Sequence, residues 1–240
     1  MDNSKIGHHI SEQFNRELED LRNKVLTMGG LVEQQIEHSV KAFTTGDLEL
    51  AERVIKQDNQ VDALEMTIDE ESCQILALRQ PTAFDLRLLL TVIKIINELE
   101  RVGDLAERIA NMAIHLSDSL GTAGKRDDYY ELQHMADLVK EMLHEALDAF
   151  ARMNIDNITD ITGLDDNVDK EYASILRQLI TQMMEDPRNI TRTLDILWTV
   201  RALERIGDHA CYICEHLIYM VKGEDVRHLS QAELEKKVKG

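Results

Sequence analysis

One short motif occurs twice in this chain, and each copy lies inside a long helical pattern. The stretch ELERVGDLA begins at residue 98 and ALERIGDHA begins at residue 202, a separation of 104 residues. A second repeated pattern, D-x-x-V-D, begins at residues 58 and 165, a separation of 107 residues. Because two different helical segments repeat together, the sequence predicts a duplicated unit.

Turn signals divide the chain into six long segments with helical periodicity. Only two prolines occur in 240 residues, and aromatic residues make up 4% of the chain, a composition that favours helices over sheets. We therefore predict an all-α fold of two pseudo-repeated three-helix bundles. The six long helices are expected at 8–43, 47–78, 83–118, 128–152, 157–184 and 190–221. The expected units are a first bundle (1–120), a linker (121–127), a second bundle (128–222) and a charged C-terminal tail (223–240).

The charge of the chain restricts its partners. It carries 45 acidic and 27 basic residues, a net charge of −18. Such a surface repels nucleic acids and anionic lipid headgroups and attracts cations or basic protein surfaces. Three cysteines, the lack of a long apolar run and an N-terminus without a signal-peptide core predict a cytoplasmic protein with no direct membrane insertion.

The repeated motifs place acids beside the apolar face of a helix. In segment 83–118 one row stays apolar throughout, while the next row becomes acidic at Glu100 and Glu107, with Gly103 between them. In segment 190–221 Glu204 interrupts the corresponding apolar row. Acids four positions apart lie on one helix face, where they repel, and burying them without a partner costs several kcal/mol.

Two kinds of partner could offset this repulsion. Arginines next to the acids in sequence could pair with them, or a hard cation could bridge the carboxylates. Gly103 and Gly207 each cost about 1 kcal/mol relative to alanine in a helix interior. They must therefore provide either close helix approach or room for ions and water. Spacing alone leaves both alternatives open.

Two further features of the sequence concern packing. Cys211 and Cys214 form a C-x-x-C motif on a helix with no second cysteine pair, which favours core packing over zinc or redox chemistry. Trp198, the single tryptophan, is expected to be a buried anchor.

Two copies of the E-R-hydrophobic-G-D motif, each with an acid pair on the preceding helix, resemble the PhoU family of bacterial phosphate-signalling regulators. The stretches TMGGLVEQQI, RQPTAFDLR and VKGEDVRH also fit the family's pattern, and the resemblance covers essentially the whole chain. It implies that each three-helix bundle carries a metal site built on an E/D-x-x-x-D motif. The ligands that it implies are Glu100, Asp104, Glu204 and Asp208, with Asp58, Asp62, Asp165 and Asp169 as facing ligands.

The resemblance also implies a regulatory function. Members of the family repress the phosphate-starvation response between the phosphate-specific ABC transporter and a membrane sensor histidine kinase. We therefore expect a negative regulator that binds the sensor kinase and the transporter's ATPase, which would recruit it to the inner membrane face. The expected cofactor is a metal ion (iron, manganese or magnesium), and the sequence does not select among them. We also expect a homodimer, although no residue of the sequence specifies one.

The two implied metal sites differ in sequence. Glu65 and Glu107 of the first repeat correspond to Tyr172 and Cys211 of the second. The second site is therefore poorer in oxygen ligands, and we do not expect equal occupancy of the two.

Two other functions remain open. A carboxylate-bridged metalloenzyme of the helical-bundle type would need Glu-x-x-His pairs on two facing helices. The two such pairs of this chain, Glu131/His134 and Glu141/His144, lie on one segment. A metal-free helical scaffold would instead need arginines paired with the acids. Because the sequence contains no Gly-rich phosphate loop or nucleophile motif, we predict that the protein is not an enzyme.

Overall fold

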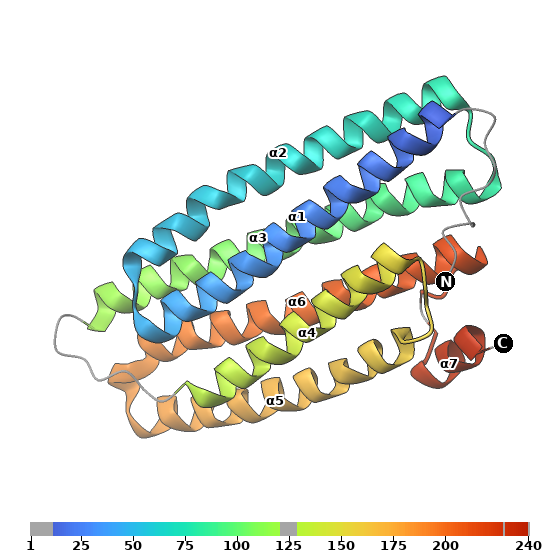
Figure 1. Cartoon of the computed structure of the whole chain (residues 1–240). Coiled ribbons are helices and arrows are strands. Elements are labelled where there is room, and N and C mark those ends of the chain that lie inside the picture. Colours follow the sequence, from blue (N-terminus) through green and yellow to red (C-terminus); the bar gives the residue numbers. More distant parts are fainter. Residues whose placement is uncertain (1–11, 121–128, 228, 240) are drawn as a thin grey trace.

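A computed structural model describes residues 12–120, 129–227 and 229–239, and within these ranges the ordered elements are helices (Figure 1). They are α1 (Glu12–Thr45), α2 (Leu48–Arg79), α3 (Ala83–Leu120), α4 (Tyr130–Arg152), α5 (Ile158–Glu185), η2 (Pro187–Asn189), α6 (Ile190–Lys222) and α7 (Gln231–Lys239). The prediction of an all-α fold with six long helices is confirmed. The predicted linker lies outside the described residues. None of the described helices combines the length and the apolar character that crossing a membrane requires.

The helices form two bundles that lie alongside each other. One bundle contains α1, α2 and α3, and the other contains α4, α5 and α6 (Figure 1). Helices α3 and α6 lie side by side and make the most extensive contact between any two of the described helices, while α1 makes a smaller contact with α4. The two helices that carry the repeated motif are therefore central in the molecule.

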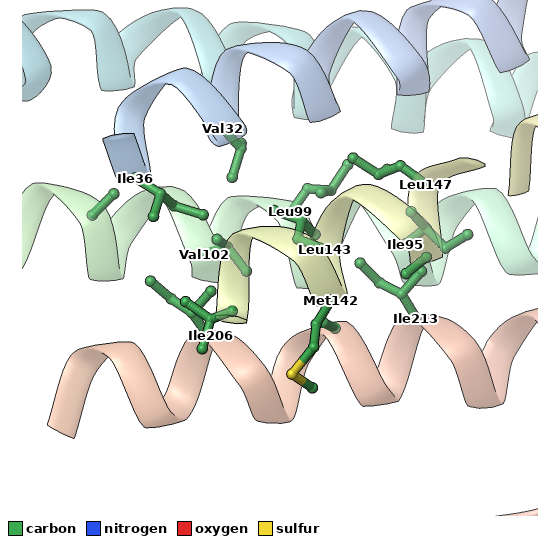
Figure 2. Packing of buried hydrophobic residues seen from close by; sticks show 14 of the residues in the cluster. Val32, Ile36, Ile95, Leu99, Val102, Met142, Leu143, Leu147, Ile206 and Ile213 are labelled. Atoms are coloured by element: carbon green, nitrogen blue, oxygen red, sulfur yellow. The ribbon is translucent and has the colours of Figure 1, made fainter. Parts of the chain in front are cut away.

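The apolar row predicted in segment 83–118 belongs to one continuous core. Every member of this row from Leu88 to Leu116 is at most 2% exposed. Figure 2 shows side chains from four helices meeting in this core: Val32 and Ile36 of α1, Leu99 and Val102 of α3, Leu143 and Leu147 of α4, and Ile206 and Ile213 of α6. Because apolar burial stabilises by about 25 cal/mol per Å², separating the bundles would be costly.

Two adjacent glycines in α1 have opposite surroundings. A Cβ atom on Gly29 would lie 2.6 Å from Cδ1 of Leu147 in α4, whereas a Cβ atom on Gly30 would meet no atom within 4 Å. We expect Gly30→Ala to stabilise the protein by about 0.5–1 kcal/mol, because alanine has the higher helix propensity. Gly29→Ala should lose that gain, because Leu147 must shift in a packed core. Urea unfolding measures both variants, and an equal response would contradict the close approach of α1 and α4 at Gly29.

The segment after α6 contains a further helix. Helix α7 lies against α5, where Leu234 is 6% exposed. The side-chain amide of Gln231 donates to the backbone oxygen of Thr159 at 3.0 Å. At the other end, Nζ of Lys222 donates to the backbone oxygen of Val238 at 3.0 Å, which satisfies a carbonyl that the helix leaves unpaired.

The single tryptophan is exposed, so the prediction that it is a buried anchor is wrong. Trp198 is 51% exposed on α6, on the same face as Leu194 and Ile190, which are 38% and 41% exposed. At the corresponding positions of α3, Leu90 and Leu86 are 36% and 39% exposed. The position of Trp198 in the helical period, and not its size, determines its exposure, because the buried row of α6 runs along another face.

Candidate metal sites

The first acidic cluster lies where α1, α2 and α3 meet. Asp58 of α2 is 7% exposed. One carboxylate oxygen each from Asp58, Asp104 and Glu107 lies within 4.8 Å of the others, the latter two residues coming from α3. Behind them, Nε2 of Gln35 in α1 donates to Oδ1 of Asp58 at 3.0 Å. Carboxylate oxygens from two helices are thus close enough together to bind one cation jointly.

The glycine of each motif makes room for an aspartate of the facing helix. A Cβ atom on Gly103 would lie 2.9 Å from Oδ1 of Asp58 and 3.4 Å from Oε1 of Gln35. A Cβ atom on Gly207 would lie 3.2 Å from Oδ1 of Asp165. A larger residue at either position would push against the carboxylate, so the glycines allow the aspartate of the facing helix to approach closely.

The second cluster repeats this arrangement with fewer oxygen atoms. Asp165 of α5 faces α6, where Glu204 and Asp208 lie on either side of Gly207. The α4 side chain nearest to the Cβ position of Gly207 is apolar, with Cγ1 of Val139 at 3.6 Å. Among the described residues, only the first cluster brings three potential metal-ligand side chains within 4.8 Å of one another.

Burial and mutual repulsion disfavour the ionised form of the deepest acids. Burial, assisted by the neighbouring carboxylates, raises the pKa of Asp58 to about 6, against the opposing effect of the hydrogen bond from Gln35. Burial and neighbouring carboxylates likewise raise the pKa of Asp165 to about 6. Burial also raises the pKa of Glu65, Glu100, Glu204 and Asp208. A bound cation would remove this repulsion.

Arginines pair with the acids of the repeated motif and leave Asp58 and Asp165 of the facing helices without a positive partner. The pairs, at N–O distances of 2.9–3.7 Å, are Arg101 with Glu100 and Asp104, Arg201 with Glu204, and Arg205 with Asp208. These arginine side chains are 44–64% exposed and lie at the rim. Among the described residues, neither Asp58 nor Asp165 takes part in an ion pair. Arginine pairing therefore accounts for only part of each cluster.

The predicted ligands divide into deep and outer residues, and two members of the first cluster were not among them. Asp62 and Asp169 are exposed on α2 and α5, at the outer side of their clusters. Glu107 and Gln35, which the predicted ligand set omits, lie in the first cluster. The candidate ligand atoms of Asp58, Asp104 and Glu107 are all carboxylate oxygens, so the first cluster fits a hard cation such as Mg²⁺ or Mn²⁺.

The histidines of the two Glu-x-x-His pairs bind acids elsewhere. Nδ1 of His144 lies 2.9 Å from Oε1 of Glu33 in α1, and His134 pairs with Glu171 of α5. Both histidine side chains are more than half exposed. They add no nitrogen ligand to either carboxylate cluster, which argues against the di-metal enzyme arrangement.

The two cysteines of the C-x-x-C motif pack in the second bundle. Cys214 is completely buried, and Cys211 packs against the core beside the second cluster. Burial raises the pKa of both thiols well above the usual range. They are therefore neutral at physiological pH, and neither is poised as a thiolate ligand or nucleophile.

Comparison with known sequences identifies relatives over the whole chain. The sequence profile of the PhoU domain matches residues 25–113 and 132–217. The phosphate-specific transport system accessory protein PhoU homolog of Pseudomonas aeruginosa is 47% identical over 233 residues, covering 97% of this chain and 95% of that protein. The phosphate-specific transport system accessory protein PhoU of Escherichia coli K12 is 45% identical over 249 residues, covering 100% and 98%.

Solved structures give the same result. The crystal structure of PhoU from Pseudomonas aeruginosa has a TM-score of 0.83 and 47% identity, covering 88% of this chain and 100% of that one. The phosphate transport system regulatory protein PhoU from Streptococcus pneumoniae has a TM-score of 0.80 and 28% identity, covering 89% and 99%. These names describe accessory and regulatory proteins and not enzymes, in agreement with the prediction from the sequence.

Proposed function

This chain belongs to the PhoU family, and we propose on that basis that it is a negative regulator of phosphate uptake and of phosphate-starvation signalling. It acts by binding a sensor histidine kinase and the ATPase of the phosphate ABC transporter. The observation that carries this proposal is its similarity, over nearly its whole length, to accessory proteins of the phosphate-specific transport system. In this proposal the protein is a cytoplasmic homodimer that its partners bring to the inner membrane face.

The exposed apolar side chains on the two central helices support a role in binding. Trp198, Leu194 and Ile190 form an exposed apolar stripe on α6, and Leu86 and Leu90 form a shorter one on α3. Large apolar side chains that gather on a surface often mark protein contacts.

A reporter strain tests the regulatory proposal. In a bacterium that lacks its own accessory protein, this chain should restore repression of a phosphate-starvation promoter in phosphate-rich medium. A Leu194→Ser/Trp198→Ser variant should lose repression and fail to co-purify with the kinase or the ATPase. Met66→Ser is the control, because Met66 is 69% exposed on α2, away from the stripe. The proposal fails if the parent neither represses the promoter nor co-purifies with either partner.

We also propose that each bundle binds metal ions, with iron, manganese and magnesium as the candidates. The support is the oxygen-rich first cluster, the aspartate without a positive partner in each cluster and the close approach of that aspartate to the glycine of the motif. The residues that would hold the ions are Asp58, Asp104 and Glu107, with Asp62 and Glu100, in the first bundle and Asp165, Asp169, Glu204 and Asp208 in the second. The ions would neutralise and rigidify the acidic face of α3 and α6.

Elemental analysis of the purified protein tests metal binding directly. Glu100→Ala/Asp104→Ala and Glu204→Ala/Asp208→Ala should each lose the metal of one bundle and keep that of the other. If the parent holds no metal even after reconstitution with iron, manganese or magnesium, the clusters serve as arginine-paired contact surfaces of a metal-free scaffold.

A further inference from the structure

Gln35 is a buried polar side chain with an unpaired oxygen that faces the first acidic cluster. The residue is 1% exposed in α1. Its Nε2 donates to Oδ1 of Asp58, while its Oε1 is buried and has no hydrogen-bond partner. That oxygen lies 3.4 Å from the position that a Cβ atom on Gly103 would take. Buried polar atoms are normally hydrogen-bonded, so this unpaired carbonyl oxygen, between Gly103 and Asp58 of the cluster, is available to bind a cation.

At the position that corresponds to Gln35, the second repeat has a methionine and no side-chain oxygen. The buried positions of α1 and α4 match at a separation of 107 residues, which pairs Phe43 with Phe150 and Gln35 with Met142. Met142 is completely buried, and the α4 side chain nearest to Gly207, Val139, is also apolar. The α1 side chain at this position of the first site is therefore polar, and the corresponding α4 side chain of the second site is apolar.

A second difference brings positive charge toward the second cluster. Tyr172 takes the place of Glu65, and the guanidinium of Arg201 lies 5.6 Å from the centre of its ring. The same arginine pairs with Glu204 at 2.9 Å. A cation entering the second cluster would therefore compete with an arginine that is already held there.

We propose that Gln35 is an oxygen ligand of the first site and makes that site the tighter of the two for hard divalent cations such as Mn²⁺ and Mg²⁺. This inference rests on the proposed metal binding. A carboxamide oxygen is an ordinary ligand for these ions and, being neutral, adds no repulsion to a cluster that already contains several carboxylates. The NH₂ group of the same amide holds Asp58 in place, so one side chain both positions a carboxylate and completes the ligand set.

Mn²⁺ binding by calorimetry tests the role of Gln35 in a background that isolates the first site. In the Glu204→Ala/Asp208→Ala variant, adding Gln35→Met should weaken Mn²⁺ binding about 10- to 100-fold, because methionine keeps the shape but removes the oxygen. In the Glu100→Ala/Asp104→Ala variant, Met142→Gln should tighten binding at the second site. Circular dichroism and thermal unfolding in EDTA verify that each variant is folded. Unchanged affinity in a folded Gln35→Met variant would overturn the proposal.

A second pair of variants separates the oxygen ligand from the hydrogen-bond donor. Gln35→Glu keeps an oxygen at this position but cannot donate to Asp58 when it is ionised. If the oxygen is a ligand, this variant should bind Mn²⁺ at least as tightly as the parent, and more tightly than Gln34→Glu, which adds the same charge on an exposed residue of α1. A loss of Mn²⁺ affinity in Gln35→Glu would mean that Gln35 serves only as the hydrogen-bond donor to Asp58, and it would overturn the proposal. If the parent binds no Mn²⁺ at all, the metal proposal itself fails.

Discussion

Asp58→Asn and Asp165→Asn should each make the metal-free protein more stable at pH 7.5 and, at the same time, reduce its stabilisation by added Mn²⁺. At this pH both aspartates are ionised in the folded protein, although burial raises the pKa of each to about 6. Asparagine has the same shape and carries no charge, so it removes the cost of burying that charge. A pKa difference of about two units corresponds to about 3 kcal/mol, so we expect a gain of about 1–3 kcal/mol per substitution.

The same raised pKa values predict how stability depends on pH. The folded protein holds a proton on each aspartate up to about pH 6, whereas an unfolded chain releases it near the ordinary value of 3.8. The contribution to stability is therefore complete below pH 3.8 and is lost as the pH rises through 6. We expect the metal-free parent to become more stable as the pH falls from 7 to about 5.

Chemical unfolding in EDTA, across pH 5–8 and then with Mn²⁺ added, measures both effects. The Asp58→Asn/Asp165→Asn double variant should show a flatter dependence of unfolding free energy on pH than the parent. Its stability should also rise less when Mn²⁺ is added. Asp20→Asn, on an exposed face of α1, is the control and should change neither. If the asparagine variants were less stable than the parent in EDTA, Asp58 and Asp165 would be holding the fold together through interactions other than metal binding.

The sequence predicts the fold well because helical periodicity and turn residues are local signals. The apolar row from Leu88 to Leu116 identifies the buried face of α3 without any knowledge of its neighbours, and the structure confirms it. The repeated motif identifies the acids in the same way, since Glu100 and Asp104 must share one face of a helix. A local pattern can therefore locate both the helices and the residues that one helix contributes to a site.

The sequence could not predict contributions that depend on which helices pack against each other. Gln35 lies in α1, far from the motif in sequence, and only its alignment with Met142 at a separation of 107 residues could have indicated it. Glu98, the first residue of the repeated stretch, lies two positions before Glu100 and has the sequence context of an ordinary surface acid, yet α6 covers it. Trp198 illustrates the opposite error. Its size and apolar character predict burial, but its position in the helical period places it on an exposed face of α6.

Glu98 is the residue whose removal should weaken the contact between the two bundles most. Its carboxylate lies at the interface of α3 with α6, where Oε2 is 2.6 Å from Nδ1 of His209 and Oε1 is 3.4 Å from Nε2 of His216. The two histidine side chains are only 9% and 11% exposed. We expect Glu98→Ala to destabilise the protein by about 2–4 kcal/mol, because it leaves two buried imidazoles without a partner and creates a cavity.

The pH dependence of this effect is opposite to that of Asp58 and Asp165. Although burial alone would raise it, the hydrogen bonds with His209 and His216 bring the pKa of Glu98 down to about 2. Its contribution to stability is therefore complete above the ordinary value of 4.5 and is lost as the pH falls toward 2. Glu98→Gln, which keeps the shape, should remove this acid-sensitive part of the stability profile.

A matched control separates a buried link between the bundles from an exposed one. Glu37 of α1 pairs with Lys140 of α4 at 2.8 Å, so this pair also joins the two bundles, but the Glu37 side chain is 61% exposed. Glu37→Ala should cost under about 1 kcal/mol, because solvent screens the pair and already hydrates both groups. Urea unfolding at pH 7 compares the two variants directly. Similar small losses for Glu37→Ala and Glu98→Ala would show that apolar packing between α3 and α6 holds the bundles together without help from the buried carboxylate and its histidines.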